Sequence, residues 1–155
     1  MSCNGGADGR IDVSVFGGVS PYTYAWSNGA SSDDLSNVVA GVYTLIITDQ
    51  NSCTLLLTDT VSEPQPILAS AVAVPNSCNG GSNGSVDLTV SGGIAPYNYL
   101  WNNFSTSQDI NGLPAGSYSV IVTDSRSCLV TTTAVVSQPA AILIAANLTP
   151  VNCNG

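Results

Sequence analysis

The feature that most constrains this chain is an internal repeat. Cys3, Cys78 and Cys153 are evenly spaced, and Cys53 and Cys128 are separated by the same interval, which we call one repeat period. The two full copies align without a gap and are identical at 32 of 75 positions, and the final CNG opens a third copy. A repeat of this length indicates that each copy is one structural unit. We therefore expect tandem modules rather than one continuous domain.

Within each copy, the residue pattern is that of short β-strands. Ile11, Val13 and Val15 alternate with Asp12 and Ser14, which is the two-residue period of a strand with one buried face. Paired glycines and single prolines mark the turns, and no 3.6-residue period with helix caps occurs. The predicted fold is all-β, with tandem small immunoglobulin-like antiparallel β-sandwiches of about six strands each. The predicted strands are 11–15, 21–27, 33–38, 42–49, 53–62 and 67–74, and in the second copy 86–90, 96–102, 108–113, 117–124, 128–137 and 142–149.

The charge of the chain excludes several classes of function. Ten residues are acidic, only Arg10 and Arg126 are basic, there is no histidine, and the net charge is −8. Nucleic acids and anionic membranes offer no cation to such a chain, so neither is an expected partner. Without histidine the usual general base, the common nucleophile triads and most zinc sites are missing. No apolar run approaches the ~20 residues of a membrane span. We expect no enzyme, no cofactor, no metal and no membrane insertion.

The five cysteines of a short, turn-rich chain indicate an oxidising compartment. The repeat restricts their pairing to two schemes: Cys3–Cys53 with Cys78–Cys128, or a Cys53–Cys78 link between modules. Four strands are predicted between Cys3 and Cys53. An antiparallel chain that crosses the sandwich four times returns to the end at which it started. This parity favours the first scheme, with one disulfide per module. Cys153 would then be unpaired here, or would pair with a cysteine of the next repeat.

Several side chains are candidate contact or modification sites. An aromatic stripe on one strand could stack on sugar rings, and its tyrosines are Tyr22, Tyr24, Tyr97 and Tyr99. The purely structural interpretation places Trp26 and Trp101 in the core. It makes Tyr43 and Tyr118 corner residues whose hydroxyls form hydrogen bonds to the backbone. Thr60 lies in an Asp-Thr-Val triplet that resembles a bacterial O-glycosylation motif.

Acidic residues gather near the predicted turns, where calcium could be bound. Asp8 and Asp33, however, are replaced by Asn83 and Gln108 in the second copy, which favours turn chemistry over calcium binding. Asp49 recurs as Asp124, and both are predicted to bond to the backbone of their own turn.

Both copies share a series of motifs in a fixed order. CNGG and a Gly-Gly pair come first, then Pro-Tyr-x-Tyr-x-Trp, Ala-Gly-x-Tyr, Thr-Asp-x-x-Ser-Cys and a closing Ser-x-Pro. This order resembles the SprB-type repeat of very large surface adhesins of gliding and other Bacteroidota. In that family the residue before the second cysteine is often glycine, whereas Ser52 and Ser127 stand there. The resemblance implies export to the bacterial cell surface by the type IX pathway, long tandem arrays and a role in attachment or gliding.

The family's arrangement favours a module that begins after Pro64. On this division, residues 1–64 are a first module that lacks its first strand, 65–139 are a second module, and 140–155 are the first strand and opening turn of a third. A module beginning at Cys3 is the alternative. The expected function is a structural segment of an extracellular adhesin, stalk or fibre, and the alternative is a repeat-borne carbohydrate-binding module. The expected partners are neighbouring repeats, with surface polysaccharide or lateral self-association as further candidates.

Overall fold

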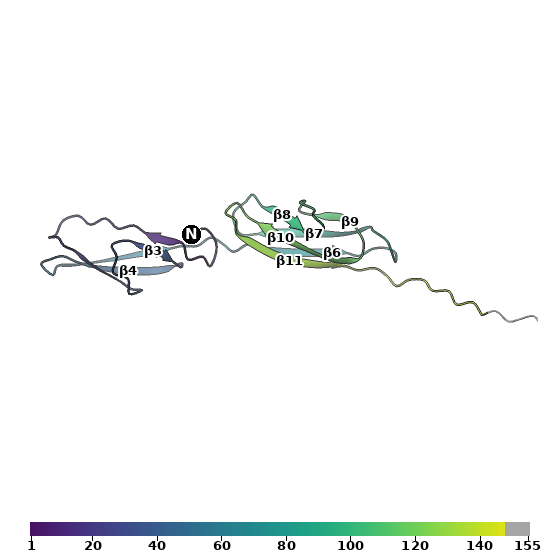
Figure 1. Cartoon of the computed structure of the whole chain (residues 1–155), viewed down its shortest axis with the longest axis horizontal. Helices are drawn as coiled ribbons and strands as arrows, with labels where there is room; N and C mark the ends of the chain where they lie inside the picture. The colour runs from purple at the N-terminus through teal and green to yellow at the C-terminus, as the bar shows by residue number, and fades with distance from the viewer. Residues whose placement is uncertain (148–155) are drawn as a thin grey trace, which may run out of the picture.

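The computed structural model describes residues 1–147, and these form eleven β-strands without any helix. The two copies are separate β-domains that follow one another along the long axis of the molecule (Figure 1). No segment of the described residues could therefore cross a bilayer as a helix. The strands are β1 (Gly9–Ile11), β2 (Thr23–Trp26), β3 (Leu35–Val38), β4 (Gly41–Thr48), β5 (Thr54–Val61), β6 (Leu68–Val74), β7 (Gly84–Ser91), β8 (Asn98–Trp101), β9 (Ile110–Leu113), β10 (Gly116–Thr123) and β11 (Leu129–Val136).

The second copy is a sandwich of two three-stranded antiparallel sheets, in the orders β6-β7-β9 and β11-β10-β8. Its core is closed, since Leu88, Trp101 and Val120 are at most 1% exposed. Trp101 lies on β8, and the hydroxyl of Tyr118 donates a hydrogen bond to the backbone oxygen of Pro114. A buried strand tryptophan and a corner tyrosine are hallmarks of immunoglobulin-like sandwiches, so the predicted fold class is confirmed. Trp26 of the first copy is buried in the same way.

The first copy has five strands, because nothing among residues 1–147 takes the place that β6 has in the second copy. In the second copy, β6 pairs with β7 from Ser85 to Ser91 and so completes a strand of eight residues. Without such a partner, β1 ends at Ile11, although the alternating pattern predicted a strand to residue 15. The open side also leaves Leu55 and Leu57 of β5 exposed, at 62% and 37%.

In each copy, two short strands together span the length of the sandwich once. In the second copy, β8 pairs with the half of β10 that ends at Thr123, and β9 pairs with the half of β7 that begins at Gly84. Both strands run in the same direction, and the chain changes sheets between them. One pass along the module is therefore shared between two half-length strands in different sheets.

The predicted strand 142–149 is not formed over the part that the structure describes. Residues 142–147 pair with no other segment, and residues 148–149 lie outside the described range. The side chains of Ile142, Leu143 and Ile144 are 94%, 89% and 91% exposed. The residues are apolar enough for a strand, but a strand needs a neighbour, and none of the described residues provides one.

Candidate functional site: the junction between the copies

The two ends of each module carry different cysteines. We call the end that holds Cys53 or Cys128 the entry pole, and the end that holds Cys3 or Cys78 the exit pole, because the chain leaves for the next copy there. Cys53 directly precedes β5, whereas the turn at Cys3 contacts the residues that follow β5: Asn4 Nδ2 donates to Pro64 O at 3.1 Å. Eight strand residues, about 26 Å at ~3.3 Å each, therefore lie between the two cysteines of one copy.

The predicted pairing within each module is wrong. A disulfide joins Cys3 to Cys128, with a Cα–Cα distance of 5.6 Å and a separation of 125 residues, and so links the exit pole of the first copy to the entry pole of the second. The parity argument fails because β2 and β3 share a single pass. Three passes, not four, separate Cys3 from Cys53, and an odd number ends at the opposite pole. Among the described residues, Cys53 and Cys78 are unpaired and exposed, and Cys153 lies outside them.

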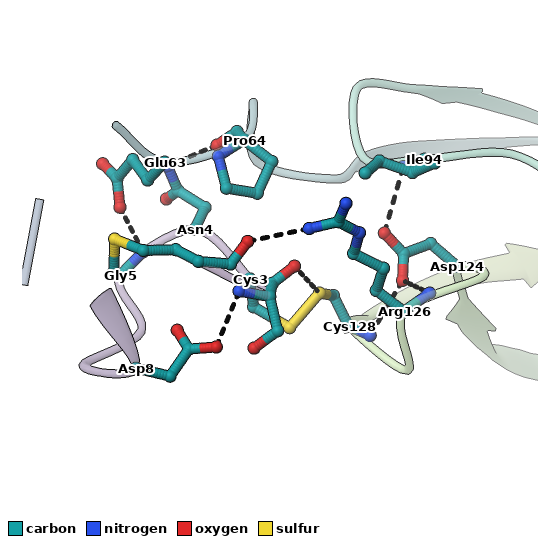
Figure 2. The surroundings of a disulfide bond; sticks show 12 residues. Cys3, Asn4, Gly5, Asp8, Glu63, Pro64, Ile94, Asp124, Arg126 and Cys128 are labelled. Atoms are coloured by element: carbon teal, nitrogen blue, oxygen red, sulfur yellow. Dashed lines mark hydrogen bonds between the residues drawn. A yellow bond between two sulfur atoms is a disulfide. The ribbon is translucent and has the colours of Figure 1, made fainter. Parts of the chain in front are cut away.

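Further contacts accompany the disulfide at this junction (Figure 2). The guanidinium of Arg126 donates a hydrogen bond to the backbone oxygen of Met1 at 2.9 Å, and Sγ of Cys128 lies 3.4 Å from the backbone oxygen of Ser2. On the first copy's side, Gly5 N donates to the carboxylate of Glu63 at 2.6 Å, which holds the cysteine turn against the end of the module. Two structural units are thus joined by a covalent bond in addition to the connecting chain.

The connecting segment itself is held by the glycine pair of the second copy. Gly93 N donates to Gln65 O at 3.1 Å, and Gly92 has a φ of +69°. A Cβ at Gly92 would overlap the backbone oxygen of Pro66, so glycine is needed there for close approach as well as for its conformation. The equivalent Gly17 of the first copy has open space around it. The difference arises because no segment among the described residues crosses the entry pole of the first copy.

Asp124 organises the entry pole of the second copy. Its Oδ1 accepts hydrogen bonds from the backbone N–H groups of Arg126 and Cys128, and its Oδ2 accepts one from Ile94. Burial opposes ionisation of this carboxyl, but the donated hydrogen bonds and the charge of Arg126 outweigh it, so the pKa lies below its ordinary value. Asp49 accepts the equivalent hydrogen bonds in the first copy. Its pKa is also lowered, and the hydrogen bond from the backbone N–H of Cys53 is the largest cause. The predicted turn role of both residues is confirmed.

We expect acid to weaken the second copy through Asp124. A carboxyl with a lowered folded pKa contributes stability that is complete above its unfolded value of 3.8 and is lost as the pH falls through the folded pKa. Urea unfolding midpoints measured between about pH 6 and about pH 2 should therefore fall in this acid range. Asp124→Asn should lower the midpoint at neutral pH and approach the parent at the acid end. A constant difference at every pH would contradict this.

The predicted contact and modification residues do not line the space at the junction. Tyr22, Tyr24, Tyr97 and Tyr99 are half-buried against the two cores, and the hydroxyls of Tyr22 and Tyr97 each donate to a glycine backbone oxygen at 2.5 Å. Thr60 is exposed on β5. The hydroxyls of Tyr43 and Tyr118 bond to backbone, as the corner interpretation predicts. Glycan contact at the four tyrosines and glycosylation at Thr60 stay predictions.

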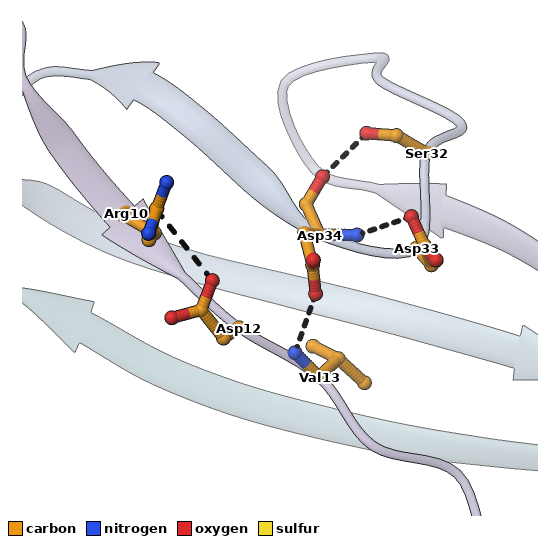
Figure 3. Close-up of polar contacts among 6 residues, drawn as sticks. All are labelled: Arg10, Asp12, Val13, Ser32, Asp33 and Asp34. Atoms are coloured by element: carbon orange, nitrogen blue, oxygen red, sulfur yellow. Dashed lines mark hydrogen bonds and ion pairs between the residues drawn. The ribbon is translucent and has the colours of Figure 1, made fainter.

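The acidic turn residues bond to backbone rather than gathering around a common point (Figure 3). Asp34 Oδ1 accepts a hydrogen bond from Val13 N at 2.8 Å, and its own backbone oxygen accepts one from Ser32 at 2.5 Å. Arg10 and Asp12 form an exposed ion pair at 3.6 Å. Among residues 1–147, no group of three or more metal-ligating side chains is close enough to hold an ion.

The fold and the junction define a class of tandem immunoglobulin-like structural modules. The SprB repeat family model matches residues 1–31 and 70–106, and these two matches end one repeat period apart, so the same part of each copy is similar to an SprB repeat. The SprB repeat family is associated with cell-surface proteins. No curated protein matches the chain. A solved structure, "Structure of amphioxus IgVJ-C2 molecule", is similar at 11% identity with a TM-score of 0.39, over 86% of this chain and 97% of that one.

Sequence reasoning does not find the junction site. The strand-parity argument considers Cys3 only with the cysteine of its own copy, and the turn pattern treats Gly92 only as a turn residue. No signal in the residue pattern reveals the shared pass, because the predicted strands 21–27 and 33–38 are within the range of lengths of the other predicted strands. In the structure β2 and β3 have 4 residues each, against 8 each in β4 and β5, and only these observed lengths and pairings place Cys3 and Cys53 at opposite poles.

Proposed function

We propose that this chain is a structural segment of an extracellular bacterial surface adhesin or stalk, without catalytic activity. In this role, tandem copies hold an adhesive region away from the cell and so contribute to surface attachment or gliding. Export by the type IX pathway is part of the proposal, since the SprB resemblance implies it. The observation that carries the proposal is the disulfide across the junction, because a spacer under tension needs modules that neither bend apart nor unravel.

The disulfide changes the path that a pulling force takes through the chain. Force applied at the two ends enters near Cys3, crosses the sulfur–sulfur bond to Cys128, and bypasses the residues between them. β1 to β10 all lie inside the bypassed loop, and only β11 follows it. Under load, almost all of the folded structure is therefore protected from mechanical unfolding, which suits a stalk.

Single-molecule pulling of the chain from its two ends tests this role. With the disulfide closed, we expect no unfolding step from the 125-residue loop. After reduction, that loop can extend by up to about 430 Å, at ~3.3–3.6 Å per residue, less the folded length already spanned. Equal extension before and after reduction would contradict a load-bearing role. Binding of the oxidised chain to soluble glycans of a panel, lost on changing Tyr22 and Tyr97 to alanine, would instead favour the carbohydrate-binding alternative.

A further inference from the structure

The junction between the two copies is a cleft of about 350 Å³ with contributions from both sides. Its exit side comes from the end of the first copy and the connecting segment, through Cys3, Pro64 and Ile67. Its entry side comes from the second copy, through Gly93 and Cys128. The junction is thus an interface with two distinct, complementary halves.

Among the described residues, the exit pole of the second copy and the entry pole of the first copy each carry one of these halves without the other. At the exit pole of the second copy, a hollow is lined by Cys78, Pro139 and Ile142, which are the repeat equivalents of Cys3, Pro64 and Ile67. At the entry pole of the first copy, a groove of about 140 Å³ is lined by residues that include Gly18 and Cys53, which are the repeat equivalents of Gly93 and Cys128. The exit side exposed on the second copy is therefore complementary to the entry side exposed on the first copy.

Among residues 1–147 the first copy has no equivalent of β6, and the segment that is one repeat period after β6 lies unpaired beyond β11. In the second copy, β6 pairs along β7 and turns Ala69 and Ala71 toward the core. The equivalent of β6, one repeat period later, begins at Leu143, and Ile142, Leu143 and Ile144 are all exposed. The place it would fill in the first copy is open along residues 12–16, and Leu55 and Leu57 are exposed beside it.

We propose that two copies of this chain associate head to tail, with residues 140–147 of one protomer entering the open side of the first copy of its partner. The register follows from β6 and β7, where Ala69 lies opposite Val90. In the equivalent register, Ile144 lies opposite Val15 and turns inward, whereas Leu143 takes the place of the outward-facing Leu68. Pairing of this kind satisfies backbone groups on both strands and buries the apolar side chains that each end exposes.

The same register brings two unpaired cysteines together. Cys78 of one protomer takes the place of Cys3, and Cys53 of its partner takes the place of Cys128. An intermolecular disulfide then closes when an oxidised small-molecule disulfide, such as that of glutathione, accepts two electrons. The two cysteine thiols lose two protons and become one S–S bond, and the small disulfide becomes two thiols. Each added protomer repeats the junction, so the product is a linear series of multimers.

The test uses the full chain with Cys153→Ser, so that the cysteine outside the described residues cannot contribute. In a buffer of oxidised and reduced glutathione, we expect a ladder of multimers on a non-reducing gel. Peptide mapping without reduction should show Cys78 joined to Cys53 and Cys3 joined to Cys128. A chain that stays monomeric at high concentration, or multimers that form only when Cys153 is present, would overturn the proposal.

Three substitutions separate strand donation from simple thiol chemistry. Ile144→Asp places a charge on the inward face of the donated strand and should reduce multimer formation about tenfold or more. Leu143→Asp carries the same charge on the outward face and should leave multimers within about twofold. Gly17→Asn keeps a residue type that accepts positive φ but puts a Cβ where the partner's connecting segment must pass, so it should also block multimers. Equal multimer yields in all three would refute the strand register. Thermal unfolding of each monomer checks that the fold is intact.

Discussion

Changing Cys3 and Cys128 together to serine should destabilise the chain by about 5 kcal/mol, the chain-entropy value for a closed loop of this length, with engineered cases often giving less. The loop spans 125 residues, so the unfolded chain gains much conformational freedom when the bond is absent. The measurement is the free energy of unfolding from urea titrations of both proteins under oxidising conditions. The loss should appear in both copies, because the bond constrains both unfolded segments.

The matched control is the double variant Cys53→Ser and Cys78→Ser. It removes the same number of cysteines from exposed positions that form no disulfide among the described residues. Exposed substitutions away from special features usually change stability by less than ~0.5 kcal/mol, and the same is expected here. A control that costs as much as the test variant would show that Cys53 and Cys78 also form disulfides, as in the pairing within each module, in contradiction to the Cys3–Cys128 assignment.

Small-angle X-ray scattering gives a second readout of the variant in which Cys3 and Cys128 are both changed to serine. With the disulfide and the Arg126–Met1 hydrogen bond in place, the two copies lie end to end (Figure 1). Loss of the covalent link leaves the short segment 64–67 and the Arg126–Met1 hydrogen bond to fix their angle. The largest dimension should therefore become more broadly distributed in the serine variant. An unchanged profile would mean that the connecting segment and the Arg126–Met1 hydrogen bond hold the modules in line without the disulfide.

Trp101→Ala should cost about 3–5 kcal/mol in the stability of the second copy, the usual range for an aromatic side chain deleted from a core. Trp101 is 1% exposed, and its Nε1 donates a hydrogen bond to Ser107 O at 2.9 Å. Its removal leaves a cavity between the two sheets and an unpaired backbone oxygen. The unfolding midpoint of the second copy, followed by urea titration, measures the loss.

Phe104→Ala is the control for this substitution. Phe104 is an aromatic residue in the loop that follows the same strand, but it is 88% exposed. Its deletion should change the free energy of unfolding by less than ~0.5 kcal/mol. Equal losses from the two variants would contradict the placement of Trp101 at the centre of the core and with it the packing of β8 against the opposite sheet.

The local residue pattern is sufficient to predict the β-strands and much of the hydrophobic core. Alternation predicts β7, and the Pro-Tyr-x-Tyr-x-Trp motif predicts β8 with its buried Trp101. These features depend on near neighbours in sequence, where side-chain period and turn residues act directly. The limits of β1 are not predictable in this way, since the length of a strand depends on a partner that the first copy does not have among the described residues.

The sequence by itself determined that the chain is a tandem array of small all-β modules with SprB-type motifs, because the cysteine spacing and the two-residue alternation recur in both copies. Only the tertiary structure decided which cysteines meet. Pairing depends on the number of passes along the module, and a pass shared between β2 and β3 cannot be distinguished from two passes by residue pattern. The disulfide therefore joins Cys3 to Cys128 across the junction, because those are the cysteines that the poles bring together.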